Sequence, residues 1–154
     1  MKLRLEWGRP LLLADAAKIN LIYAFDPAKL PAKAGIYLFG RKYGTQFEAL
    51  YVGKAGNLRS RAKGQMNNLR LMQHLKNAKN GKRILLAARF VSGPGQQEEK
   101  CLSILERALI RHFLSEGHDL VNKQGTKLRR HEISSLGAKG SVPKLMFVDR
   151  VRGE

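Results

Sequence analysis

The alternation of apolar and polar side chains predicts a β-hairpin in the first third of the chain. Strand-like segments cover residues 35–40 and 49–53, and Tyr43-Gly44-Thr45 between them has the composition of a turn. Each strand carries one tyrosine, Tyr37 and Tyr51. If the strands pair antiparallel with these tyrosines opposite each other, both phenols leave the sheet on the same face.

Helical patterns and one further strand follow the hairpin. Asn57 can cap the first helix, and Gly117 ends the last one. Apolar residues recur along one stripe of that last helix, whereas the strand is mostly apolar. The elements predicted are a helix from Asn57 toward Leu69, a helix over 71–80, a buried strand over 84–91 and a long helix over 97–116.

Strand-like segments also lie near both ends of the chain. Residues 3–7 and 20–25 fit strands, and residues 11–18 fit either a strand or a short helix. A last strand is expected over 145–148, with residues 3–7 as a candidate partner. The patterns predict one compact α/β (α+β) domain, with a small mixed or antiparallel sheet of three core strands flanked by helices and extended by the terminal strands. Its parts would be an N-terminal extension over 1–33, a core over 34–125 and a basic extension over 126–154.

Net charge separates this chain from an average globular protein. Its 154 residues include 29 Lys and Arg against 12 Asp and Glu, which gives +17. This excess favours a polyanionic partner, of which nucleic acid is the commonest and an acidic membrane surface the alternative. The segment Ala49–Gln97 contains ten Lys or Arg and no Asp or Glu. A charge run is usually a solvated face, but its place directly after a two-tyrosine hairpin favours a surface that follows phosphates.

Composition limits where the protein would act. With 44% hydrophobic and 27% charged residues the chain is typical of a globular protein. Its apolar runs are too short to cross a bilayer, and its first residues lack the apolar core of a signal peptide. Cys101 is the single cysteine, which excludes an internal disulfide and favours a reducing compartment. We therefore expect a cytoplasmic protein with no membrane partner.

Two charged residues could complete a site for phosphodiester hydrolysis beside the tyrosines. Such a reaction needs a base for the attacking water, positive charge on the phosphate oxygens and stabilisation of the leaving oxygen. A helix that starts near Asn57 would hold Arg61 beside the tyrosine face. Glu106 borders the apolar face of the long helix, where a carboxylate needs a cation as partner. Mg²⁺ accepts a single protein carboxylate together with water and substrate phosphate.

The motifs Gly35-Ile36-Tyr37 and Tyr51-Val52-Gly53 resemble the signature of the GIY-YIG nuclease superfamily. The resemblance covers roughly residues 30–125 and includes five polar positions in the expected order. The residues that match the family's site are Tyr37, Tyr51, Arg61, Glu106 and Asn122, with Gly53 and Lys54 in the turn after the second motif.

The resemblance implies a metal-dependent DNA endonuclease in which one Mg²⁺ or Mn²⁺ takes part. In this reading Tyr37 is the general base toward water, helped by Tyr51, and its pKa must be lowered by nearby charge such as Lys54. Arg61 would stabilise charge on the phosphate, and Glu106 would hold the metal. Asn122 would orient Glu106 or Tyr37. The residues expected to contact nucleic acid are Gly53, Lys54, Arg59, Lys63, Arg70, Lys127, Arg129 and Arg130.

One position departs from the family pattern. Many relatives have His or Tyr four residues after the arginine, where this chain has Gln65. Glutamine forms hydrogen bonds but exchanges no proton at neutral pH. Either the site works without that partner, or His74 replaces it, or activity is reduced. A nucleic-acid-binding module with weak or no catalysis is therefore the alternative function.

Overall fold

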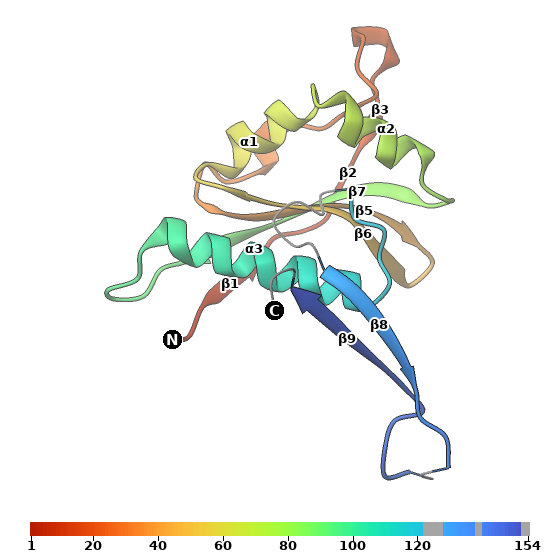
Figure 1. The fold of residues 1–154 in the computed structure, drawn as a ribbon. Helices are drawn as coiled ribbons and strands as arrows, with labels where there is room; N and C mark the ends of the chain where they lie inside the picture. The colour runs from red at the N-terminus through yellow and green to blue at the C-terminus, as the bar shows by residue number, and fades with distance from the viewer. Residues whose placement is uncertain (122–127, 138–139, 152–154) are drawn as a thin grey trace.

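An antiparallel sheet of five strands forms the centre of the molecule, and helices cover both of its faces (Figure 1). The structure, a computed structural model, describes residues 1–121, 128–137 and 140–151. The strand order is β1-β7-β5-β6, and β2 also pairs with β7. The strands are β1 (Arg4–Trp7), β2 (Leu11–Leu12), β5 (Gly35–Tyr43), β6 (Gln46–Ala55) and β7 (Lys82–Val91).

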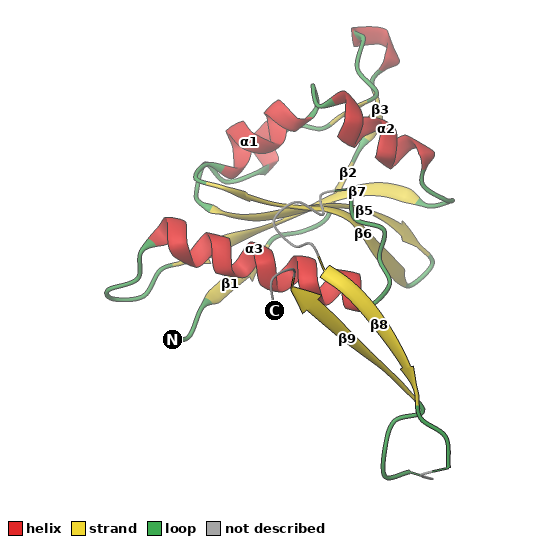
Figure 2. Ribbon diagram, viewed as in Figure 1, coloured by secondary structure: helices red, strands yellow, loops and turns green. Residues whose placement is uncertain are grey.

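Two helices pack on one face of this sheet and a third packs on the other (Figure 2). The helices are α1 (Leu58–Gln65), α2 (Leu69–Asn77) and α3 (Glu98–Ser115). Side chains alternate between the faces, so β5 contributes Tyr37 and Phe39 to the core under α1 and α2, and Ile36 and Leu38 to the core under α3. The mixed α+β class and the three helices predicted from the sequence are thus confirmed within the described residues.

Asparagine side chains set the starts of the first two helices. Asn57 Oδ1 accepts a hydrogen bond from the Ser60 backbone at 3.1 Å, as predicted for the α1 cap. Asn68 Oδ1 accepts one from the Leu71 backbone at 3.1 Å and begins α2. Because this second cap starts a new helix, α1 ends at Gln65 rather than continuing toward Leu69.

The expectations for the ends of the chain are partly wrong. Residues Arg4–Trp7 pair with β7, and β9 (Leu145–Val151) pairs with β8 (Leu128–Ser134) in a separate two-stranded sheet. The candidate pairing between residues 3–7 and 145–148 is therefore wrong, since β9 pairs with the nearest strand before it in sequence. The expected extension of the three core strands by N-terminal strands is confirmed, since β1 and β2 both pair with β7.

Short elements complete the described part of the chain. The segment 11–18, predicted as strand or short helix, contains pieces of both. None of the helices described combines the length and the apolar composition needed to cross a membrane. The remaining elements are β3 (Ala14–Asp15), β4 (Tyr23–Ala24) and two 3₁₀ helices, η1 (Ala17–Ile19) and η2 (Pro27–Lys29).

The hairpin of β5 and β6 is shaped by a tight turn and a β-bulge. Its turn holds two residues, since Tyr43 pairs with Gln46, and Gly44 takes a φ of 60° that suits such a turn. Farther along, the pairing shifts by one residue between Phe39 and Gly40. Neither feature is part of the sequence-based register, which assumed a three-residue turn and an unbroken ladder.

The turn and the bulge together move the pairing by two positions. Tyr37 lies opposite Gly53, and Phe39 lies opposite Tyr51. The prediction that the two tyrosines lie directly opposite each other is therefore wrong. Since side chains alternate with a period of two, a shift of two residues still leaves both tyrosines on the same face.

Candidate active site

The two tyrosines form a stacked pair on the face that α1 and α2 cover. The ring centroids of Tyr37 and Tyr51 lie 5.8 Å apart, with the ring planes 28° from parallel. Tyr37 is fully buried at 0% exposure, whereas Tyr51, on the edge strand β6, is half-buried. Of the two phenols, Tyr51 is thus the one nearer to solvent.

Gln65 joins the two phenols. Its Nε2 donates a hydrogen bond of 2.7 Å to Tyr37 Oη and one of 3.1 Å to Tyr51 Oη. The sequence predicts that Gln65 can form hydrogen bonds but exchange no proton, and the structure shows it hydrogen-bonded to both phenols. His74, the suggested substitute, instead makes a 2.8 Å contact between its Nε2 and the Asp119 carbonyl oxygen.

Gly53 makes room for the inner phenol. A Cβ atom on Gly53 would lie 2.4 Å from Tyr37 Cζ and 2.5 Å from its hydroxyl oxygen. This explains the glycine of the second motif by packing within the hairpin, because Tyr37 lies across its Cα. Gly53 is itself buried, so its position does not favour the direct contact with nucleic acid expected for it.

Burial dominates the acidity of Tyr37. It raises the pKa of Tyr37 well above its ordinary value, and the neighbouring Tyr51 raises it further. Hydrogen bonds from Gln65 and Arg61 act in the opposite direction without reversing the shift. The pKa is therefore not lowered in the way that the general-base role expected for Tyr37 requires, and Tyr37 keeps its proton at neutral pH.

Arg61 links the tyrosine pair to solvent. It lies four residues before Gln65 in α1, so both side chains project from the same side of that helix. The hydrogen-bonding influence of the Tyr37 hydroxyl is the main cause of the raised pKa of Arg61, and Tyr51 contributes less. The Arg61 side chain is exposed, so a cation lies where the buried pair meets the surface.

Helix α3 carries the acidic residues of the candidate site. Glu99, Ser103 and Glu106 share one face of this helix, since they are spaced at i, i+4 and i+7. Lys54, near the end of β6, donates from Nζ to Glu99 Oε1 at 3.0 Å and to Ser103 Oγ at 2.8 Å. The predicted site residue Lys54 is thus directed toward α3 and helps to fix its distance from the sheet.

Glu106 has the environment of a carboxylate that a cation would stabilise. Burial raises its pKa, while the charge of Lys54, a hydrogen bond from the Lys54 backbone and the charge of Arg61 lower it in part. The described residues contain no group of three or more His, Cys, Asp and Glu that could enclose a metal. A single half-buried carboxylate fits Mg²⁺, which needs few protein ligands and retains water.

Two of the predicted catalytic residues, Lys54 and Arg61, lie around the end of β6, which is an edge strand with helices on both sides. A depression of about 470 Å³ lies there and reaches from α1 to α3. The residues that line it are Lys54, Ala55, Gly56, Asn57, Ser60, Arg61, Glu99 and Leu102. The tyrosines and Glu106 are not among these lining residues: the tyrosines lie on the face covered by α1 and α2, and Lys54 and Glu106 lie on the α3 side.

The structure therefore brings together most of the residues proposed for catalysis. Direct contacts or electrostatic effects connect Tyr37, Tyr51, Arg61, Lys54 and Glu106. Asn122 lies outside the described residues, and so does Lys127 among the nucleic-acid candidates. Arg129 and Arg130 belong to β8, where they lie opposite Arg150 and Asp149 in the backbone register of the two strands.

The basic residues of the segment Ala49–Gln97, which contains no Asp or Glu, differ in the contacts that they make. Arg59 donates from Nε to the Leu30 carbonyl at 2.9 Å and anchors α1 to the residues before the hairpin. Lys63 and Arg70 are exposed, and within the described residues neither side chain has a hydrogen bond or an ion pair. Acids from outside the segment pair with two of its cations, Glu99 with Lys54 and Glu6 with Arg89.

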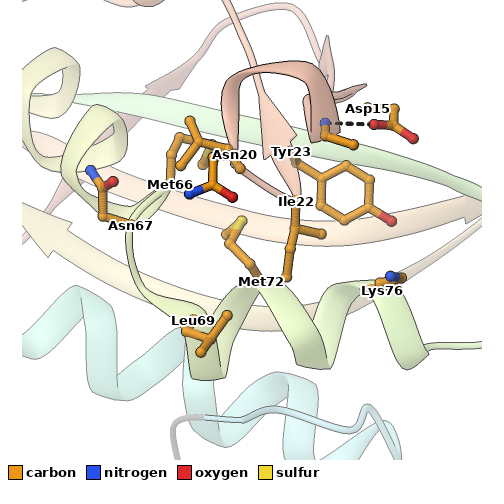
Figure 3. Close-up of a pocket in the computed structure, with 11 residues that line it drawn as sticks. Asp15, Asn20, Ile22, Tyr23, Met66, Asn67, Leu69, Met72 and Lys76 are labelled. Carbon is orange, nitrogen blue, oxygen red and sulfur yellow. Dashed lines mark hydrogen bonds between the residues drawn. The ribbon is translucent and has the colours of Figure 1, made fainter.

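A second cavity, of about 510 Å³, lies between the β3–β4 hairpin and α2 (Figure 3). Met66 and Met72 point into it from the helical side, and Ile22 and Tyr23 from the hairpin. None of the residues predicted for catalysis lines it. It is therefore separate from the site at the end of β6.

Comparison with known proteins shows that this chain is similar to part of a longer protein. The chain is 30% identical over 131 residues to a UvrABC system protein C from Syntrophotalea carbinolica. The similarity covers 85% of this chain and 19% of that protein, so the chain spans about one fifth of the relative's length. No family model matches the chain. No solved structure matches it either.

Proposed function

We propose that this protein is a metal-dependent DNA endonuclease of the GIY-YIG type. The observation that carries the proposal is the convergence of a buried phenol pair, an exposed arginine and a half-buried glutamate at one end of β6. The similarity to a UvrABC system protein C supports a nuclease-related function at this coarse level. The net charge of +17 favours nucleic acid as the partner.

In the proposed reaction the tyrosine pair serves the attacking water. Tyr51 is the phenol that reaches solvent, and as its phenolate it would accept the proton of the attacking water. Tyr37 lies behind it and keeps its proton, so we assign it to supporting Tyr51 by hydrogen bonding rather than to acting as the base. Arg61, whose pKa both phenols influence, would bind a non-bridging phosphate oxygen.

Glu106 would hold the divalent metal, Mg²⁺ or Mn²⁺, on the α3 side. A metal bound there would supply positive charge for the phosphate and the leaving oxygen. Lys54 keeps the end of β6 attached to α3 through Glu99 and Ser103, which holds Glu106 near Arg61. Asn122 keeps the orienting role that the resemblance implies.

Plasmid cleavage tests this function. Purified protein is expected to nick supercoiled DNA with Mg²⁺ or Mn²⁺ and to stop when EDTA removes the metal. A chain with one such site would cut one strand at a time, so nicked circles should precede linear DNA. If DNA is bound but no form of it is nicked with either metal, the alternative of a binding module is correct. The non-titrating Gln65 at the tyrosines is the observation that favours this alternative.

DNA binding is expected to weaken steeply with salt, and Lys63 and Arg70 should contribute to that slope. For duplex DNA each lost phosphate contact reduces the slope of log K against log salt by about 0.9. The double variant Lys63→Ala/Arg70→Ala should therefore lower it by up to about 1.8. Fluorescence anisotropy across a salt series measures this.

The matched control removes two exposed cations of α3, in the double variant Lys100→Ala/Arg111→Ala. Its slope should change less than that of the first pair. Equal losses in both double variants would show that binding depends on net charge alone. A flat salt dependence in the unaltered protein would rule out the phosphate-following surface.

A further inference from the structure

A directed chain of hydrogen bonds runs from the start of α2 to the tyrosine pair. The Leu71 backbone N–H donates to Asn68 Oδ1 at 3.1 Å. Asn68 Nδ2 then donates to Gln65 Oε1 at 3.0 Å. Gln65 Nε2 finally donates to Tyr37 Oη at 2.7 Å and to Tyr51 Oη at 3.1 Å. A helix cap is thus connected to the candidate catalytic phenols through two side-chain amides.

The Leu71 backbone N–H, at the start of this series of hydrogen bonds, determines the direction of every bond in it. A backbone N–H can only donate, so the Asn68 atom that caps α2 must be the oxygen. Its Nδ2 therefore faces Gln65, which must present Oε1 in return. The two N–H bonds of Gln65 are left for the two phenols. Gln65 is only 5% exposed, so an inverted amide would bury its Nε2 against another donor, Asn68 Nδ2.

We propose that Asn68 is a positioning residue for the tyrosine pair, acting through Gln65 to keep both phenol oxygens as hydrogen-bond acceptors. The catalytic meaning of this inference rests on the proposed function, whereas its geometric part does not. A donor directed at the Tyr51 oxygen stabilises its phenolate, which is the form that can accept a proton from the attacking water. An amide oxygen in the same place would force both phenols to donate and would oppose that charge.

The substitution Asn68→Asp separates the two tasks of this residue. Aspartate caps a helix as well as asparagine does, so α2 should still begin at the same place. Its carboxylate has no N–H, however, and cannot donate to Gln65 Oε1. The Gln65 amide should then turn over, with Nε2 toward residue 68 and Oε1 toward the phenols.

Asn67→Asp is the matched control. It makes the same chemical change and the same charge change one residue away, at an exposed side chain on the rim of the second cavity (Figure 3). Within the described residues Asn67 takes no part in the chain that reaches the tyrosines. Any effect of added negative charge near α2 should therefore be seen in both variants.

Two readouts test the proposal on the full chain. Nuclear Overhauser contacts between the Gln65 side-chain amide protons and the rings of Tyr37 and Tyr51 report which end of the amide faces the phenols. They should be strong in the unaltered protein and in Asn67→Asp, and weak in Asn68→Asp. In plasmid cleavage, Asn68→Asp should lower kcat about 10- to 100-fold, the value of a hydrogen bond to a charged group, with KM for DNA changed little.

The outcomes are distinct. Unchanged amide contacts in Asn68→Asp would overturn the inference whatever the cleavage rate. Turned amide contacts with an unchanged kcat would confine Asn68 to a structural role and would also overturn it. If the unaltered protein cleaves no DNA, the proposed function fails, but the amide contacts still decide the geometric part. If Asn68→Asp does not fold, Asn68→Ser, which keeps a capping oxygen and loses the Nδ2 donor, should weaken the same contacts relative to Asn67→Ser.

Discussion

Cleavage by the Glu106→Ala variant is expected to fall about a thousandfold or more, to the level seen with EDTA. Loss of the metal removes several kcal/mol of charge stabilisation from the transition state, and each 1.36 kcal/mol is about tenfold in rate. The plasmid assay with Mg²⁺ or Mn²⁺ measures the loss. Glu98→Ala is the control, because Glu98 is an exposed acid in the first turn of the same helix.

The same variant should fold at least as well as the unaltered protein. Burial raises the pKa of Glu106 in the folded state above its unfolded value, so the stability that this group contributes is present at low pH and is lost as pH rises through the folded pKa. At neutral pH its removal therefore carries no loss of stability from that source. Thermal unfolding at pH 7.5 should show an equal or higher Tm for Glu106→Ala. An unchanged cleavage rate would contradict the metal assignment, and loss of cleavage together with folding would leave Glu106 a structural residue.

The Gly53→Ala variant is expected to be destabilised by about 1–3 kcal/mol, the usual cost of overpacking a core. Its new methyl group would overlap the Tyr37 ring, which is fully buried and would have to move within the core. Urea unfolding measures the change. Cleavage should fall as well, since any movement of Tyr37 disturbs its bonds to Gln65 and Tyr51.

Gly64→Ala provides the comparison for this glycine. Gly64 lies in α1, where a Cβ would meet nothing within 4 Å. Alanine is better than glycine in a helix by about 1 kcal/mol, so this variant should be neutral or more stable. If both glycine variants behaved alike, the close approach of Tyr37 to Gly53 would not explain the glycine of the second motif.

The sequence predicts the elements of this fold well and their long-range pairing less well. The helices at Asn57 and at 97–116 follow from caps and apolar stripes, which are local signals. The pairing of β9 with β8 and the addition of β1 to β7 depend on which edges are open in space. No local signal carries that information.

In the candidate site, too, features that have a local sequence signal are predicted, whereas features that depend on tertiary packing are not. The predicted members Arg61 and Glu106 are brought near each other, as the resemblance implies. The i+4 spacing between Arg61 and Gln65 predicts that both lie on the same face of α1. The residue type of Gln65, which differs from the family's titrating residue, does not predict that it bridges the two phenols. The lowered acidity of Tyr37 was missed because burial depends on the whole packed domain.

The number of residues between Tyr37 and Tyr51 decides whether the two side chains project from the same face of the hairpin, and the bulge contributes one residue to that number. With the two-residue turn alone, Tyr37 and Tyr51 would project from opposite faces of the sheet, because their pairing would be out of phase by one residue. The extra residue at the bulge restores the phase and brings the second phenol to the first. Insertions or deletions of two residues between the tyrosines can therefore leave the pair together, whereas a change of one residue separates them unless another bulge compensates.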